Sequence, residues 1–340
     1  LGLAEARALP FAPFPHNEDY ELDLHRPCID SLTLVDDAGR EYERIPEVVD
    51  CWVESAAMPY ASAHAGFPAD FIAEYIAQTR TWFYYLHALG VLLKGSRAFN
   101  AVVSTGTILA EDGAKVSKSK GNYTDPLALM EQYGADAFRF YLMGSVVMQG
   151  EDMRFADEGV RDAHNRVVGI LQNCLAFFEL YKKEYGGTVR AEDSSHVLDR
   201  WILARLAKAN GEITEAFEAY DMPRVCREVR AFTEDYSTWY LRRSRERVKP
   251  ASSADEREYA LGTQREALLG FSKLIAPIMP FLAEEMYRTT GGEKESVHLE
   301  NWEEARCKKQ DARIIAEMDI VRHIVSLALE QRAKANIKIR

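Results

Sequence analysis

The stretch "FNAVVSTGTILAEDGAKVSKSKGN" (99–122) joins an apolar, β-branched run to a loop that holds three lysines and two serines after residue 113. The apolar run predicts a buried strand, and the preceding "DFIAEYIAQTRTWFYYLHALGVLL" (70–93) predicts a long helix. A helix that leads into such a strand is typical of an α/β layer with a parallel sheet. The lysine-rich loop therefore follows directly after a strand of that sheet.

The segments on either side of this region predict a change of fold class along the chain. Upstream, "SLTLVDDAGREYERI" (31–45) predicts a strand pair with Asp-Asp-Ala-Gly as its turn. Downstream, "DPLALMEQYGADAFRFYLMG" (125–144) begins a helix, with Asp125 as its cap and Pro126 in its first position. Beyond residue 155 nearly everything repeats every 3.6 residues, with linker-like breaks at 186–195 and 249–256. We therefore expect an α/β part followed by an all-α helix bundle.

Length, charge and cysteines restrict the function. The 340 residues, 47% of them hydrophobic, predict more than one packed domain. The net charge of -11 gives no overall attraction to nucleic acid, so any such contact needs a local basic patch. The five cysteines are scattered and form no C-x-x-C pair, which excludes a zinc knuckle and fits a reducing cytoplasm. We find no membrane-spanning run or signal peptide, and the chain, which opens without Met, reads as a piece of a longer protein.

The lysine-rich loop has the composition of a polyphosphate clamp. It is not a Walker A loop, because the G-x-x-x-x-G-K-[ST] spacing is absent. Two glycines, Gly113 and Gly121, bracket it. Ammonium groups neutralise phosphate charge and hydroxyl groups bind the oxygens. The residues concerned are Lys115, Ser117, Lys118 and Ser119. Composition alone leaves a solvated surface loop as the alternative.

A resemblance decides between these readings. "KVSKS" (115–119), followed by "KGNYTDP" (120–126), resembles the Lys-Met-Ser-Lys-Ser signature of class I aminoacyl-tRNA synthetases, with Val116 in place of Met. In that family the loop follows the last part of a Rossmann fold and holds the pyrophosphate of ATP. The resemblance implies that Lys115, Ser117, Lys118 and Ser119 bind ATP and that the two lysines are catalytic. It implies Mg²⁺ with the ATP and no protein-bound metal.

Two upstream segments narrow the resemblance. "RIPEVVDCWVESAAMPYA" (44–61) and "FPADFIAEYIAQTRTWFYYLHALG" (67–90) look like isoleucyl-tRNA synthetases. This implies an aminoacyl-adenylate site made of Trp52, Glu74, Gln78 and Trp82. The two indoles would wall the isoleucine side chain, because flat rings suit a branched aliphatic group. Ala77 and Thr81 depart from the family pattern, so neither is given a role. The alternative for both tryptophans is ordinary core packing.

The helical part agrees with that family's anticodon-binding bundle. The similar segments are "LDRWILARL" (198–206), "EDYSTWYLRRSRERV" (234–248), "LIAPIMPFLAEEMY" (274–287), "SVHLENW" (296–302) and "RAKANIKIR" (332–340). Within them one basic run supplies the local patch that the overall charge lacks, and we expect it to contact tRNA phosphate. Its members are Arg242, Arg243, Arg245, Arg247 and Lys249. A solvated helix face is the alternative for each.

The resemblance implies a domain order. Residues 1–45 end an inserted region, 46–155 form the second half of a Rossmann-type catalytic domain, 156–195 connect, and 196–340 form a truncated anticodon-binding bundle. The family's His-x-Gly-His signature and its editing domain are missing. "HAGF" (64–67) lacks the second histidine, so we take His64 as a surface or packing residue.

The implied function is ATP-dependent ligation of isoleucine to tRNA(Ile) by a cytoplasmic monomer. We expect the isolated fragment to be inactive. Valyl- or leucyl-tRNA synthetase is the alternative within the enzyme class, and a non-catalytic tRNA-binding module is the alternative outside it.

Overall fold

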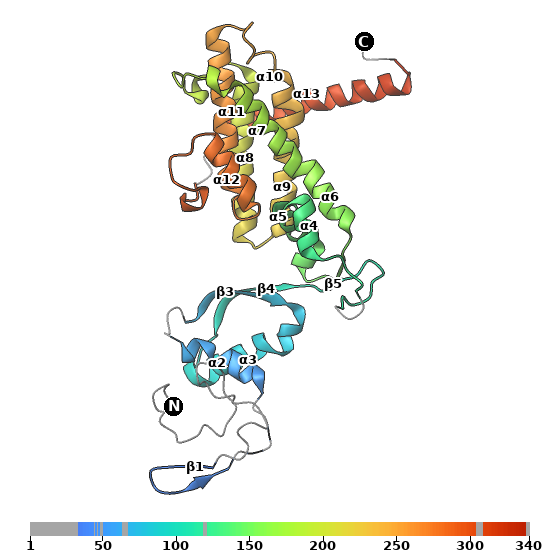
Figure 1. The fold of residues 1–340 in the computed structure, drawn as a ribbon. Coiled ribbons are helices and arrows are strands. Elements are labelled where there is room, and N and C mark those ends of the chain that lie inside the picture. The colour runs from blue at the N-terminus through green and yellow to red at the C-terminus, as the bar shows by residue number, and fades with distance from the viewer. Residues whose placement is uncertain are drawn as a thin grey trace. The chain divides into compact units, whose positions relative to one another are not determined.

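The computed structural model describes residues 33–43, 45, 47, 50–62, 67–117, 121–303 and 309–337. The chain divides into two compact units (Figure 1). One contains residues 1–67 and 80–98, and the other contains residues 68–79 and 99–340. Lys118, Ser119 and His64 lie outside the described residues, as do Cys28 and Cys307.

The first unit contains the predicted strand pair. β1 (Leu34–Val35) pairs antiparallel with β2 (Glu41–Tyr42). The turn forms locally, because Asp36 Oδ1 accepts the backbone N–H groups of Ala38 at 3.0 Å and Arg40 at 2.9 Å. The N–H of Arg40 also lowers the pKa of the Asp36 carboxyl. The predicted hairpin is confirmed.

Two helices, α2 (Cys51–Ala61) and α3 (Trp82–Lys94), complete the described part of this unit and pack on each other. Asp50 joins them: it accepts the Trp52 N–H at 2.8 Å as the cap of α2 and the Tyr85 hydroxyl of α3 at 2.9 Å. The last turns of α3 pack closely against the residues that follow the helix, since a Cβ on Gly90 would lie 3.0 Å from the Ala98 Cβ. Only a small residue fits there.

The second unit begins with short parallel strands. β3 (Ala69–Tyr75) pairs with β4 (Phe99–Thr105), and β5 (Ile108–Leu109) pairs with β6 (Met153–Arg154). The predicted parallel pairing is therefore present, but each sheet of the described chain has two strands. The α/β part followed by an all-α part is confirmed; a complete Rossmann half is not seen in these residues.

The predicted helix over 70–93 is wrong in its first part. Residues 69–75 form strand β3, a 3₁₀ turn η1 follows at Ile76–Arg80, and the helix begins only at Trp82. Within β3, Ile72 is buried while Phe71 and Ala73 on either side of it are exposed, as expected when successive side chains point to opposite faces of a strand. Residues 69–75 are too few to distinguish a helical repeat from a strand repeat. Their pairing with β4 is what makes them a strand.

The helix after the lysine-rich loop starts as predicted. α4 (Pro126–Tyr133) has Asp125 as its cap, which accepts the Leu127 N–H at 3.0 Å. It ends at Gly134, whose φ of +85° favours glycine, and α5 (Ala135–Met143) follows. After the 3₁₀ turn η2 (Val146–Gln149), α6 (Asp157–Ala163) runs through the π-helical turn η3 (His164–Val168) into α7 (Gly169–Tyr181).

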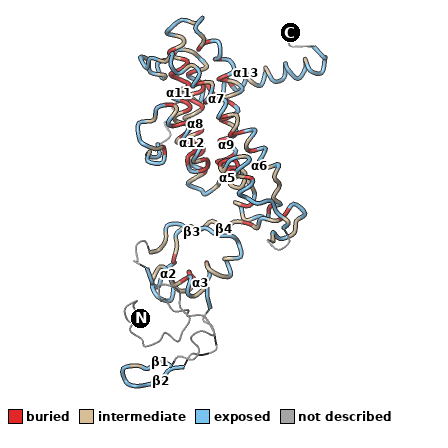
Figure 2. Tube along the Cα trace, in the orientation of Figure 1, coloured by how far each residue is buried: buried red, intermediate tan, exposed pale blue. Residues whose placement is uncertain are grey.

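The predicted bundle is present. Its helices are α8 (Val197–Glu218), α9 (Met222–Glu234), α11 (Ala254–Ile275), α12 (Pro280–Thr289) and α13 (Lys309–Lys334). α9 continues through the π-helical segment η6 (Asp235–Leu241) into α10 (Arg242–Ser244). The buried residues follow the inner faces of these helices in Figure 2. Trp201, Tyr236, Tyr240, Phe271 and Tyr287 are fully buried there.

Two polar side chains of α5 fasten it to the bundle. Asp136 accepts the Leu282 N–H at 2.6 Å, at the start of α12. Arg139 donates to the carbonyls of Ile278 and Pro277, both at 2.9 Å, just after α11 ends. The break between α11 and α12 was not predicted, and α5 satisfies the backbone groups that it leaves open.

Only the first part of α13 belongs to the bundle core. Ile314, Ile315 and Met318 are buried, whereas Ile320 and Ile324 are exposed, and the helix extends away from the bundle in Figure 1. Despite its 26 residues, α13 is too polar to cross a bilayer, and the same holds for the other helices of the described ranges.

Candidate functional site

The lysine-rich loop starts as a tight turn after β5. Lys115 forms an antiparallel bridge with Leu109, and the Ala110 N–H donates to the Ala114 carbonyl at 2.8 Å. Gly113 turns the chain with a φ of +85°. The first turn of the loop is therefore fixed by backbone hydrogen bonds to the strand that precedes it.

Asn122 closes the loop from its other end. Its Oδ1 accepts the Ser117 N–H at 2.9 Å, and its Nδ2 donates to the Lys115 carbonyl at 3.1 Å. The Gly121 N–H also donates to the Ser117 carbonyl at 3.1 Å. One amide side chain thus holds the backbone of both Lys115 and Ser117. The sequence showed Asn122 as part of the "GN" tail, without a role.

Of the four predicted ATP ligands, Lys115 and Ser117 can be placed. Lys115 is exposed and Ser117 is half-buried. Lys115 forms no ion pair with another described residue, so its ammonium is available to an anion. Val116, which stands in place of the usual Met, is 39% exposed.

The structure adds a cation that the sequence did not indicate. A Cβ on Gly113 would lie 3.2 Å from the Arg154 guanidinium, so Arg154 of β6 flanks the turn that starts the loop. Parallel pairing of β5 with β6 brings it there across more than forty residues of sequence. No sequence signal could have indicated this proximity, because it depends on strand pairing.

A small apolar cavity lies at the carboxyl ends of the parallel strands. Its volume is about 360 Å³, and it is lined by Tyr75, Thr105, Gly106, Thr107, Ile108, Leu142, Val147 and Met148. A Cβ on Gly106 would lie 1.9 Å from the Glu151 carbonyl oxygen, so glycine is required there. Parallel α/β sheets bind ligands at this edge.

The predicted adenylate residues fall in both units. Glu74, exposed near the end of β3, is in register with Ser104 of β4, and Gln78 is half-buried in η1. These two share a unit with the lysine-rich loop. Trp52 and Trp82 belong to the other unit, where both are half-buried and Trp82 lies 5.7 Å from the Phe83 ring.

One departure from the family pattern has a simple explanation. Thr81 has a φ of −128° and a ψ of −109°, outside the region of positive φ that favours glycine. A side chain at this position therefore needs no left-handed backbone. For Ala77 the structure offers no comparable explanation.

The predicted basic run divides into exposed and buried members. Arg242, Arg243 and Arg245 are exposed, and Lys249 is half-exposed and bound to Glu246 at 2.6 Å. Arg247 is only 8% exposed and donates to both carboxylate oxygens of Asp199, at 2.6 and 2.7 Å. The prediction that Arg247 contacts tRNA does not fit this burial.

Arg247 is instead part of a buried network. Asp199, with no exposed surface, also accepts the hydroxyls of Ser194 at 2.7 Å and Tyr240 at 3.1 Å. Glu256 binds the other edge of the Arg247 guanidinium. Burial alone would lower the pKa of Arg247, but the two carboxylates outweigh it and raise that pKa. The residue is therefore a charged structural link between α8 and α11.

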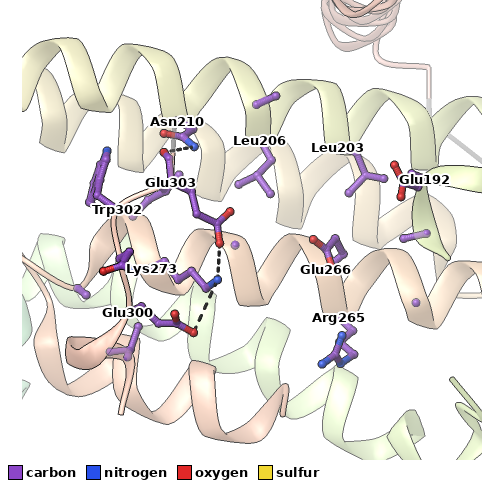
Figure 3. Close-up of a pocket in the computed structure, with 18 of the residues that line it drawn as sticks. Glu192, Leu203, Leu206, Asn210, Arg265, Glu266, Lys273, Glu300, Trp302 and Glu303 are labelled. Atoms are coloured by element: carbon purple, nitrogen blue, oxygen red, sulfur yellow. Dashed lines mark hydrogen bonds and ion pairs between the residues drawn. The ribbon is translucent and has the colours of Figure 1, made fainter. Parts of the chain in front are cut away.

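A second, larger cavity holds none of the predicted residues. It measures about 1200 Å³ and lies between α8, α11 and residues 297–303 (Figure 3). Lys273 of α11 binds Glu303 at 2.5 Å across it, and Asn210 donates to the Glu303 carbonyl at 3.1 Å. Lys273 and Glu303 are thus paired with each other, whereas Arg265, also in the lining, donates to the Gly291 carbonyl. Across the described chain no group of three or more His, Cys, Asp or Glu side chains could hold a metal ion.

Comparison with known proteins places both parts of the chain. The family model described as tRNA synthetases class I (I, L, M and V) matches residues 14–155, and the one described as the anticodon-binding domain of tRNA ligase matches residues 199–340. Isoleucine–tRNA ligases of Chlamydia trachomatis serovar L2, Nocardia farcinica and Deinococcus radiodurans are 41%, 40% and 40% identical. Each alignment covers 94% of this chain but 32%, 31% and 31% of the relative.

The chain therefore spans about a third of the length of the curated relatives it matches. A similar solved structure is the LeuRS of Agrobacterium radiobacter K84 in a ternary complex with tRNA and LeuAMS. Its TM-score is 0.62 at 21% identity, and the match covers 83% of this chain and 36% of that chain. This likeness concerns the fold alone. With part of a catalytic domain followed by an anticodon-binding domain, the chain belongs to the class I tRNA synthetases of the I, L, M and V group.

Proposed function

We propose that the protein is an isoleucine–tRNA ligase, which activates isoleucine with ATP and transfers it to tRNA(Ile). The similarity to isoleucine–tRNA ligases over both parts of the chain supports this. Residues 46–155 act as the second half of a Rossmann-type catalytic domain, 156–195 as the connection, and 196–340 as the anticodon-binding bundle. Residues 1–45 are the end of an inserted region. The protein works as a cytoplasmic monomer.

The closed base of the lysine-rich loop is the observation that carries the catalytic proposal. Asn122 and the bridge to Leu109 fix the backbone of Lys115 and Ser117. The loop starts beside the carboxyl ends of parallel strands, where nucleotides bind in α/β sheets. A fixed base suits a clamp that holds pyrophosphate.

The first step forms a bond between the isoleucine carboxylate and the α-phosphate of ATP and breaks the bond to pyrophosphate. Lys115 and Lys118 neutralise the charge that builds on the leaving pyrophosphate, and Ser117 and Ser119 donate hydrogen bonds to it. Mg²⁺ bound to the ATP would shield the charge of its phosphates. In the second step a hydroxyl of the terminal tRNA ribose attacks the carbonyl carbon, and AMP leaves.

The amino acid and the adenylate need a separate set of residues. Glu74 and Gln78 position the adenylate, and Trp52 and Trp82 contact the aliphatic side chain of isoleucine. For tRNA, the exposed Arg242, Arg243 and Arg245 and the half-exposed Lys249 bind backbone phosphate. Arg247 is left out of this set.

Amino-acid-dependent ATP–pyrophosphate exchange tests the proposal in the complete gene product. Isoleucine should support exchange far better than valine or leucine. A preference for valine or leucine would instead identify the protein as a valine– or leucine–tRNA ligase. No exchange with any of the three would leave only a tRNA-binding module. Residues 1–340 alone contain no His-x-Gly-His signature, so this fragment should show no exchange.

The clamp itself is tested by Lys118→Ala in the complete protein. The exchange rate should fall at least tenfold while the isoleucine KM changes little, because the charge is needed in the transition state. Lys208→Ala, at an exposed lysine paired with Glu212, is the matched control. An unchanged exchange rate in Lys118→Ala would refute the clamp.

A further inference from the structure

Arg243 lies over an indole ring. Its guanidinium carbon is 3.3 Å from the centre of the Trp239 ring, one helical turn earlier in the chain. The indole is held in turn, because its Nε1–H points to the Met318 sulfur of α13 at 3.1 Å. The stacked pair is therefore preorganised: the arginine loses little further freedom when it binds a partner.

α13 brings a second arginine to the same ring. The Arg322 guanidinium lies 5.7 Å from the Trp239 ring centre and binds Asp235 at 2.5 Å. Asp235 is itself shared with the buried Arg205, at 2.8 Å. Arg205 also binds Glu228, and Arg322 also lies 3.8 Å from Asp319, so both of these arginines are paired with carboxylates.

The charge on Arg243 is balanced by no carboxylate. Within the residues the structure describes, neither Arg242 nor Arg243 has an acidic partner within ion-pair distance. Partial burial, together with the positive charges of Arg242 and Arg322, lowers the pKa of Arg243. By contrast, Arg205 and Arg247 in the same bundle each bind two carboxylates. An anion is the group that this cluster lacks.

We propose that Arg243, stacked on Trp239 and flanked by Arg242 and Arg322, binds a phosphodiester of single-stranded RNA and stacks beneath a neighbouring base. The inference rests on the proposed function for the identity of the RNA, which would be an unpaired segment of the tRNA. A guanidinium fork matches phosphate geometry, and its flat face accepts any base. Trp239 and Arg322 are thereby added to the tRNA surface from outside the run of basic residues.

The test measures tRNA(Ile) transcript binding to the complete protein over a range of salt concentrations. Arg243→Gln should weaken binding about tenfold and lower the slope of log K against log salt by about 0.7, the value for one lost single-strand phosphate contact. Arg243→Lys should keep the slope but weaken binding about fivefold, because a compact ammonium cannot stack as a plane. Arg224→Gln, at an exposed arginine paired with Glu215, is the control and should leave both quantities unchanged.

Two results would overturn the inference: an unchanged affinity and slope in Arg243→Gln, or a lysine variant that binds like the wild type. A thermal melt of each variant guards against loss of the fold. Pyrophosphate exchange by the wild-type protein reports separately on the proposed function, since it needs no tRNA contact. The two claims can therefore fail independently.

Discussion

Replacing Asp199 by alanine should destabilise the bundle strongly. The substitution removes both oxygens that hold Arg247 at 2.6 and 2.7 Å and leaves the Ser194 hydroxyl without its acceptor and the Tyr240 hydroxyl with only the Ala260 carbonyl at 3.4 Å. Breaking a buried ion pair on one side costs about 3–5 kcal/mol, because the remaining charge stays buried. Glu256 still binds Arg247, so we expect the lower end, about 3 kcal/mol. Guanidinium unfolding followed by far-UV circular dichroism measures this loss.

A double-mutant cycle makes the reasoning refutable. Asp199→Ala with Arg247→Met removes both charges, so the loss should be smaller than the sum of the two single losses, by about 1–3 kcal/mol. Glu317→Ala breaks an exposed pair with Arg313 and should cost less than about 1 kcal/mol. A loss below about 1 kcal/mol in Asp199→Ala would refute the buried-pair account.

The same cycle separates structure from tRNA binding at Arg247. If Arg247 contacted tRNA, Arg247→Met would lower the salt slope of tRNA binding by about 0.7–0.9 and leave stability unchanged. The burial of its guanidinium predicts the reverse: a less stable bundle, with the slope unchanged wherever the protein remains folded.

Three shorter predictions follow from single contacts. Asn122→Ala should lower the exchange rate of the complete protein about tenfold, since losing its contacts at 2.9 and 3.1 Å should raise the barrier by roughly 1.4 kcal/mol. Asn122→Asp, which keeps the acceptor for Ser117, should retain more activity. Burial raises the pKa of the Cys226 thiol to about 12, so a thiol reagent at pH 8 should modify the exposed Cys51 and spare Cys226, as peptide mass mapping would reveal. Burial would raise the pKa of the Glu258 carboxyl, but the N–H donors of Gly186 and Thr188 outweigh it and lower that pKa below 4.5. The stability that the ionised carboxylate contributes above pH 4.5 is therefore lost as the pH falls further. Glu258→Gln should flatten this loss in thermal melts between pH 6 and 3.

Features that depend on neighbouring residues were predictable. The Asp36 turn and the Asp125 cap with Pro126 involve hydrogen bonds and dihedral preferences within a few residues, so their sequence signals carry the whole physical cause. The KVSKS motif and the helical repeat of the bundle were readable for the same reason. The comparisons confirm the class to which they pointed.

Features that depend on distant residues were not predictable. Strand β3 was predicted as helix because only its pairing with β4 favours an extended backbone. Arg154 reaches the loop through the pairing of β5 with β6, and Arg322 reaches Trp239 through the packing of α13. In the run 242–249, spacing made five cations look alike, although Arg247 faces Asp199 in the interior.

By itself, the sequence determined the order of the parts, the chemistry of the lysine-rich loop and the membership of a synthetase class, because motif and local pattern carry that information. Only the tertiary structure decided which charged side chains remain available to a ligand. A cationic side chain can bind a ligand only if no carboxylate from another helix already pairs with it. Likewise, the position of a strand or helix depends on the elements that bury its apolar face.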